Sequence, residues 1–141
     1  MTIRFPHVVL ADDDDDDRDF FCAGMERIFP YIGVFTFKDG EELFEYLNTA
    51  APDLPDCIFL DYKMPRLTAP QFLRRTGEGT RYSEVPKIVW STSQRQKDID
   101  ECLGLGAVRF IVKPETDGEL DTVIRSLECW IYRHSRTAIW Y

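Results

Sequence analysis

Five short apolar runs recur along the chain, and each is separated from the next by a longer stretch with helical periodicity. Runs such as VVL, CIFL and IVW do not alternate with polar residues, which is typical of parallel strands covered by helices on both faces. The second run is short and more polar than the others, which favours a position at the edge of a sheet. The predicted strands are residues 7–11, 33–37, 56–60, 87–91 and 108–112.

Apolar residues between and after these runs recur at three- and four-residue steps, the spacing of an amphipathic helix. The predicted helices are residues 15–29, 40–49, 69–77, 95–104 and 117–133. Strand and helix units in series require right-handed crossovers, so the pattern predicts a doubly wound α/β fold: five parallel strands with helices on both faces. Ligands of such sheets bind at the carboxyl ends of the strands.

The length of 141 residues is near the usual size of one domain, so we expect a single domain over residues 1–141. Its core is predicted at about residues 5–133, followed by a tail at residues 134–141. The formal net charge of -8 disfavours contact with the nucleic-acid backbone. No run approaches the roughly 18 apolar residues of a membrane-spanning helix, and no cleavable signal pattern precedes the first strand. We therefore expect a cytoplasmic protein that binds neither nucleic acid nor membrane.

Polar side chains follow four of the predicted strands. Asp12 and Asp13 come after the first strand, Asp61 after the third, Ser91 at the end of the fourth and Lys113 after the fifth. Because the carboxyl ends of parallel strands meet at one edge of the sheet, we expect three carboxylates, a hydroxyl and an ammonium to share one crevice. Such a set is hard to obtain by chance, which makes this edge the candidate functional site.

The segments VVLADD, LDYKMP, IVWS and VKP, in this order and at this spacing, resemble the receiver domain of two-component response regulators, including the stand-alone chemotaxis type. The resemblance spans roughly residues 5–130 and implies a flavodoxin-like strand order, 2-1-3-4-5. It implies a signalling switch rather than an enzyme, phosphorylated by a histidine kinase or a phosphotransfer protein. The downstream partner is a protein that the sequence does not identify, and receivers of this kind also form homodimers.

Individual roles follow from the same resemblance. Asp61 is the expected phosphoacceptor, Asp12 and Asp13 the acidic pair, Ser91 the switch hydroxyl and Lys113 the lysine that contacts the phosphoryl group. The resemblance also implies that the protein takes part in phosphotransfer to its own Asp61 and in the later hydrolysis of the aspartyl phosphate.

The resemblance also implies a Mg²⁺ cofactor, an ion that prefers hard oxygen ligands. The expected direct ligands are the carboxylates of Asp13 and Asp61 and the backbone carbonyl of Lys63, with Asp12 acting through water. Phe110 falls on the aromatic switch position. The side chains of Lys63 and Thr92 flank the expected phosphorylation site and could control access to it.

Some features favour other interpretations. Ala69 stands where receivers commonly have glycine, so the loop before it is expected to take a different path, with Pro70 starting a helix. Asp14 to Asp17 are read as an N-cap and an acidic first turn of a helix. One alternative function is a phosphorylation-independent interaction module with the same fold. Another is a phosphatase of the haloacid dehalogenase type, which needs an acid where this chain has Lys63.

Overall fold

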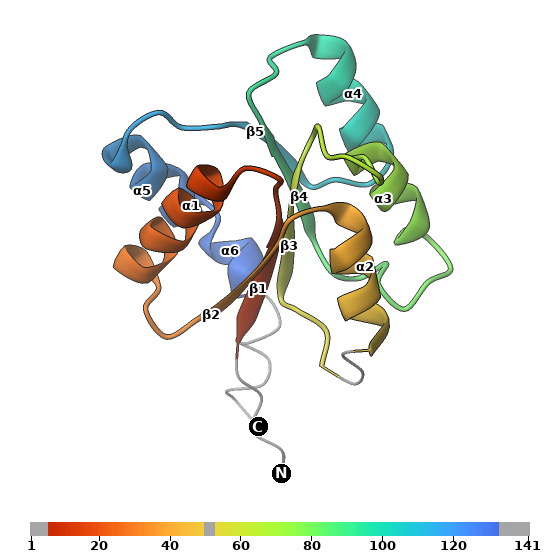
Figure 1. The fold of residues 1–141 in the computed structure, drawn as a ribbon, viewed down its shortest axis with the longest axis horizontal. Coiled ribbons are helices and arrows are strands. Elements are labelled where there is room, and N and C mark those ends of the chain that lie inside the picture. Colours follow the sequence, from red (N-terminus) through yellow and green to blue (C-terminus); the bar gives the residue numbers. More distant parts are fainter. Residues whose placement is uncertain (1–5, 50–52, 133–141) are drawn as a thin grey trace.

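The computed structural model describes residues 6–49 and 53–132, and within them five strands form one parallel sheet (Figure 1). The strands are β1 (His7–Ala11), β2 (Gly33–Phe37), β3 (Cys57–Asp61), β4 (Lys87–Ser91) and β5 (Arg109–Val112). Their order is β2-β1-β3-β4-β5, which confirms the predicted doubly wound topology. The more polar β2 lies at an edge, as its sequence predicts.

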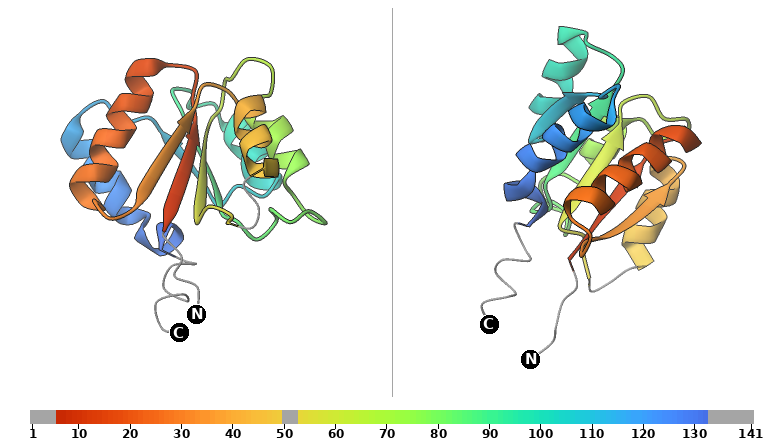
Figure 2. Two further views of the ribbon diagram at one scale, coloured as in Figure 1. Left: turned by 60° about the horizontal axis from the view of Figure 1, so that its bottom comes forward. Right: turned by 90° about the vertical axis from the view of Figure 1, so that its left-hand side faces the viewer.

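Helices cover both faces of the sheet, as Figures 1 and 2 show from three directions. One face carries α1, α5 and α6, and the other carries α2, α3 and α4. The helices are α1 (Asp15–Ile28), α2 (Gly40–Thr49), α3 (Ala69–Arg75), α4 (Gln96–Gly104), α5 (Asp117–Ser126) and α6 (Glu128–Ile131).

Two hydrophobic cores lie on the two sides of the sheet, because successive residues of a strand point to opposite faces. In β1, Val9 and Ala11 pack with the α2–α4 layer, whereas Val8 and Leu10 pack with α1, α5 and α6. Every residue of β1, β3 and β4 is buried, which explains why their sequences do not alternate with polar residues. The sheet is therefore a rigid platform, and its carboxyl edge holds whatever side chains follow the strands.

The last predicted helix is wrong in one respect, because residues 117–133 do not form one continuous helix. Helix α5 ends at Ser126, and the short α6 begins at Glu128. Leu127 lies between them with φ -98° and ψ 6°, and its N–H donates to the Ile124 carbonyl. This tighter turn rotates the chain so that both Leu127 and Ile131 are buried in the same core.

Other boundaries differ from the prediction by one or two residues. β3 includes Asp61, which pairs with Trp90 of β4 instead of following the strand. β5 begins at Arg109. α3 ends at Arg75 rather than residue 77, because Gly77 is a poor helix former and the Thr76 carbonyl accepts a hydrogen bond from Lys87.

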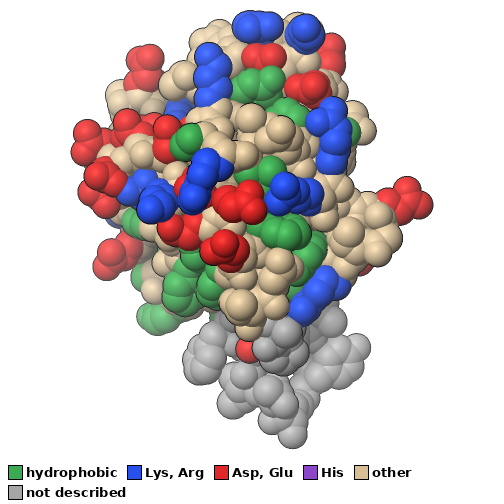
Figure 3. Space-filling model, turned by 45° about the vertical axis from the view of Figure 1, so that its right-hand side comes forward, with side chains coloured by type: hydrophobic (Ala, Val, Ile, Leu, Met, Phe, Trp, Pro, Cys, Tyr) green, Lys and Arg blue, Asp and Glu red, His purple; other side chains and the backbone are tan. Residues whose placement is uncertain are grey.

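The surface agrees with the acidic composition. Figure 3 shows Lys and Arg side chains interspersed with Asp and Glu on one face, with acidic side chains gathered at its left margin. Among the described residues, no helix has both the length and the apolar character needed to cross a bilayer. The predicted tail, residues 134–141, lies outside the described residues.

Candidate functional site

Three carboxylates meet at the carboxyl edge of the sheet, where the sequence places them. Oxygen atoms of Asp12, Asp13 and Asp61 all lie within 4.8 Å of one another. Asp12 is fully buried and Asp61 is 6% exposed, whereas Asp13 faces solvent. The cluster therefore has a buried floor and one accessible side, an arrangement that suits a bound cation with an open coordination position.

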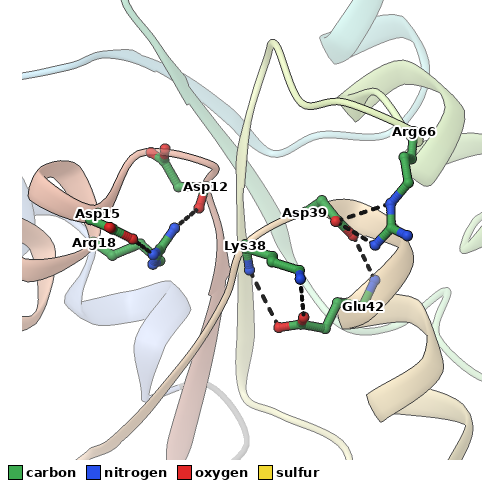
Figure 4. A network of polar contacts seen from close by, with 7 residues as sticks. All are labelled: Asp12, Asp15, Arg18, Lys38, Asp39, Glu42 and Arg66. Atoms are coloured by element: carbon green, nitrogen blue, oxygen red, sulfur yellow. Dashed lines mark hydrogen bonds and ion pairs between the residues drawn. The ribbon is translucent and has the colours of Figure 1, made fainter.

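Backbone contacts fix the loop that carries the acidic pair. The Asp12 N–H donates to the Phe37 carbonyl, and the Asp14 N–H donates to Oδ1 of Asp12. Arg18 reaches back from α1, and its Nη1 donates to the Asp12 carbonyl at 2.6 Å. Arg18 also forms an ion pair with Asp15, so one guanidinium joins the loop to the first turn of α1 (Figure 4). Asp12 is thus held on both its backbone and its side chain.

Lys113 brings the only ammonium that contacts this cluster in the described part of the chain. Its Nζ lies 3.0 Å from Asp12 Oδ2 and 3.4 Å from Asp61 Oδ1. Its backbone N–H donates to the Ser91 carbonyl at 2.8 Å, which extends the pairing of β5 with β4. The ammonium also lies 5.3 Å from the centre of the Trp90 ring, a distance that allows a cation–π contact.

The electrostatics of the cluster leave an excess of negative charge. Burial, together with the nearby Asp12 carboxylate, raises the pKa of Asp61 to about 7 in spite of Lys113. Burial also raises the pKa of Asp12. Burial alone would lower the pKa of Lys113, but its carboxylate partners raise it, so the ammonium stays charged. One ammonium does not balance three carboxylates, and a second cation would relieve the repulsion.

The carboxylate oxygens of the cluster also fit a divalent metal ion. Oδ2 of Asp12 is buried, and among the described residues it meets the Lys113 ammonium at 3.0 Å without a well-aligned hydrogen bond. Oxygen-only donor sets are those that Mg²⁺ and Mn²⁺ prefer. Lys63, whose backbone carbonyl is the expected additional ligand, lies in the exposed loop after β3.

The remaining predicted residues differ in their burial. Ser91 is buried, and its Oγ accepts a hydrogen bond from the Ser93 N–H at 3.0 Å. Thr92 and the side chain of Lys63 are exposed. Phe110 is half-buried, and its ring centre lies 6.3 Å from that of Tyr62.

Pro70 lies at the start of α3, as the sequence predicts. Thr68 and Gln71 form a reciprocal capping box at the start of α3, and Pro70 occupies its first turn. Arg66 has a left-handed backbone, with φ 68°, and its guanidinium pairs with the buried Asp39 at 2.6 Å. Figure 4 shows this pair joining the loop to Asp39, the residue directly before α2. The ion pair holds a backbone conformation that is unfavourable for a residue with a side chain.

Sequence reasoning missed several contacts near the site. Asp17, read only as part of an acidic helix start, accepts a hydrogen bond from Lys113 Nζ at 2.8 Å. Tyr62 donates through its hydroxyl to Asp98, which also accepts a hydrogen bond from the Ser93 hydroxyl. No motif marks these residues, because their contacts depend on how α1 and α4 pack on the sheet.

A cavity of about 670 Å³ opens beside the cluster. Asp13 and Lys63 lie on its wall, together with Tyr62 and residues of α3 and α4. The exposed side of the site is therefore accessible to another molecule.

Comparison with known proteins gives a consistent match. The family model for the response regulator receiver domain matches residues 8–125. Two-component response regulator ORR5 of Oryza sativa subsp. japonica is 31% identical over 109 residues, covering 77% of this chain and 78% of that protein. Two-component response regulator ARR3 of Arabidopsis thaliana is 39% identical over 118 residues, covering 77% of this chain and 49% of that protein.

Solved structures share the fold. The phosphorylated cyanobacterial phytochrome response regulator RcpA superposes with a TM-score of 0.81 at 23% identity, covering 91% of this chain and 94% of RcpA. The Mn²⁺-bound response regulator Rcp1 gives a TM-score of 0.78 at 17% identity, covering 89% of this chain and 94% of Rcp1.

Proposed function

Because the chain belongs to the response regulator receiver domain family, we propose that Asp61 is its phosphoacceptor and that phosphorylation of this residue switches the protein between two signalling states. Receiver domains take part in phosphorylation-based two-component signalling, and the family generally signals without acting as an enzyme on other substrates. One observation carries the assignment to Asp61. Its buried carboxylate lies within 4.8 Å of two other carboxylates and 3.4 Å from an ammonium.

The metal in this proposal is Mg²⁺. Receiver domains bind Mg²⁺ or Mn²⁺ at an acidic cluster of this kind, and the solved relative Rcp1 holds Mn²⁺. Asp13, Asp61 and the Lys63 carbonyl are the proposed direct ligands, with Asp12 acting through water. When bound, the ion supplies positive charge that offsets the carboxylates and the oxygens of the transferring phosphoryl group.

Phosphotransfer in this site needs a nucleophile, a positive charge and an in-line approach. Asp61 supplies a carboxylate oxygen, which forms a bond to phosphorus while the bond from phosphorus to the donor histidine nitrogen breaks. The electron pair of that bond stays on the imidazole. Lys113, whose Nζ lies 3.4 Å from Asp61 Oδ1, would contact an oxygen of the phosphoryl group as the charge of that group redistributes.

The proposed output begins at Ser91. Its Oγ accepts a hydrogen bond from Ser93, and on phosphorylation it would donate to the new phosphoryl oxygens. That movement would open space for the Phe110 ring and change the surface formed by α4, β5 and α5. Leu103 and Val112 on these elements are 44% and 42% exposed, so a downstream protein or a second copy would find apolar contacts there. Thr92 and the Lys63 side chain would control access to the phosphoryl group.

The proposed donor is a histidine kinase or a phosphotransfer protein. The alternative, an interaction module that works without phosphorylation, leaves the buried carboxylates and Lys113 without a use. Direct hydrolysis of small phosphate esters is disfavoured because Lys63, and not an acid, stands two residues after Asp61.

Phosphoryl transfer from phosphoramidate tests the proposal, because this donor has the phosphorus–nitrogen bond of a phosphohistidine. With Mg²⁺ present, we expect intact mass spectrometry to show one added phosphoryl group on the parent protein and none on Asp61→Asn. Asp16→Asn is the matched control, since Asp16 is an exposed acid outside the cluster. Undiminished labelling of Asp61→Asn would reject the assignment. Partner binding unchanged by Asp61→Asn would favour the alternative.

A further inference from the structure

The ammonium of Lys113 lies closest to a carboxylate outside the acidic cluster. Its Nζ donates to Oδ2 of Asp17 at 2.8 Å, which is shorter than its distances of 3.0 Å to Asp12 and 3.4 Å to Asp61. The Lys113 side chain is 11% exposed, so few water molecules compete for its donors. In this structure the lysine therefore points as much toward α1 as toward the proposed phosphoacceptor.

The start of α1 fixes Asp17 in this position. Asp14 caps the helix, and its Oδ1 accepts a hydrogen bond from the Asp17 N–H at 2.9 Å. Asp15 pairs with Arg18 along the helix. Asp16 is exposed and pairs with no side chain among the described residues. Of the four acids from Asp14 to Asp17, only Asp17 reaches the lysine after β5, which is 96 residues away in the sequence.

A lysine ammonium has three donors, and a phosphoryl group on Asp61 would bring new, highly charged acceptor oxygens. Lys113 would have to turn toward those oxygens and lengthen or share its contact with Asp17. The contact with Asp17 would therefore be weaker after phosphorylation than before it. An interaction that favours only one of two states shifts the equilibrium toward that state.

We propose that Asp17 is a positioning residue that competes with the Asp61 phosphoryl group for Lys113 and so disfavours the phosphorylated state. This inference rests on the proposed function of Asp61. Asp17 is not one of the proposed direct metal ligands and does not touch the reacting atoms. It meets the site through its hydrogen bond with Lys113, and its charge also helps to raise the pKa of Asp12.

Binding of beryllofluoride, a phosphoryl analogue, tests the competition. At saturating Mg²⁺, we expect Asp17→Asn to bind beryllofluoride roughly fivefold more tightly than the parent, the size of a partly exposed, charged hydrogen bond. Asp16→Asn removes the same charge from the same turn without touching Lys113, and should change the affinity by less than about twofold. Asp17→Glu keeps the charge and should restore the parent affinity.

A spectroscopic readout separates positioning from a general effect on charge or folding. In the absence of beryllofluoride, the side-chain ¹³Cε signal of Lys113 should move in Asp17→Asn and stay in place in Asp16→Asn. Equal affinities for the two Asn variants, or weaker binding by Asp17→Asn, would overturn the competition and leave the function of Asp61 intact. Equal responses of the parent and Asp61→Asn to beryllofluoride would instead overturn the proposed function and this inference together.

Discussion

Two lysines lie at opposite ends of the sheet, Lys87 buried and Lys113 with its side chain 11% exposed, and their surroundings differ in kind. Lys113 lies at the carboxyl edge among the carboxylates of Asp12, Asp17 and Asp61. Lys87 begins β4 at the amino edge, and its Nζ donates to two backbone carbonyls, those of Thr76, at 2.9 Å, and Tyr82. The lysine at the carboxyl edge thus has charged partners, whereas the lysine at the amino edge has neutral ones.

The pKa values of the two amines shift in opposite directions. Burial opposes the charge of both, but the carboxylates around Lys113 raise its pKa above the ordinary value. Burial lowers the pKa of Lys87 to about 8, and the nearby Glu84 carboxylate offsets this decrease only in part. Burial of a lysine therefore does not mark a functional site. The charge of its partners separates an ammonium that can stabilise phosphoryl transfer from one that secures a loop.

The largest effect is expected from Lys113→Met. Without the ammonium, the acidic cluster loses its only described positive partner, and phosphorylation of Asp61 should slow by about a hundredfold or more. Removing one partner of a buried ion pair also costs on the order of 3 kcal/mol of unfolding free energy at neutral pH. Rates of phosphoramidate labelling and urea unfolding curves measure both effects.

Lys97→Met is the control, because Lys97 is an exposed lysine of α4. It should leave the labelling rate and the unfolding free energy nearly unchanged. If Lys113→Met is labelled as fast as this control, the contrast between the two lysines has no functional meaning.

The second effect concerns Lys87 and has a defined pH window. In the unfolded chain a lysine titrates near 10.5, whereas folded Lys87 titrates near 8, so the unfolded state binds more protons between these values. The Lys87 contribution to the unfolding free energy should therefore rise by about 3 kcal/mol as the pH goes from 8 to 10.5.

Lys87→Met removes this rise, and the difference between the parent and variant unfolding curves isolates it from other titrating groups. Lys113 does not interfere. Because its pKa is raised, its contribution to the unfolding free energy stays constant below pH 10.5 and is lost only above that pH. A pH-independent difference between parent and Lys87→Met would show that Lys87 is not desolvated in solution.

The two lysines also show what the sequence can and cannot predict. The position of Lys113 is predictable, because β5 is apolar and the residue after a parallel strand lies at the carboxyl edge. The same rule places Asp12, Asp61 and Ser91. The contact between Asp17 and Lys113 depends on how α1 packs against β5, and no spacing in the sequence encodes it. Lys87 resembles an ordinary polar start of a strand until the structure shows it covered by the loop after α3.

Mg²⁺ should bind only at the carboxyl edge of the sheet. Its contribution to the unfolding free energy should be smaller than the effects expected for Lys113 and Lys87. A ligand at about a hundred times its dissociation constant contributes roughly 2.7 kcal/mol to the unfolding free energy. We expect the full increase in the parent and in Lys87→Met, and a reduced one in Asp61→Asn, which has lost a proposed ligand. Thermal unfolding with and without EDTA measures it. A full increase in Asp61→Asn would place the metal elsewhere.

The smallest expected effect sharpens the description of Lys87. Glu84 is exposed and favours the charged form of this lysine, so Glu84→Gln should lower the Lys87 pKa a little further. Because solvent and salt screen an exposed charge, the change should shrink as the ionic strength rises. NMR titration of the Lys87 ¹³Cε signal measures it. Glu78→Gln is the control, because Glu78 and Lys87 both line a second cavity, which is separate from the one beside the carboxylate cluster. A larger change from Glu78→Gln would mean that Lys87 responds to the cavity and not to Glu84. If neither variant moves the titration, burial alone sets the Lys87 pKa, and the contrast with Lys113 becomes one between desolvation and direct charge pairing.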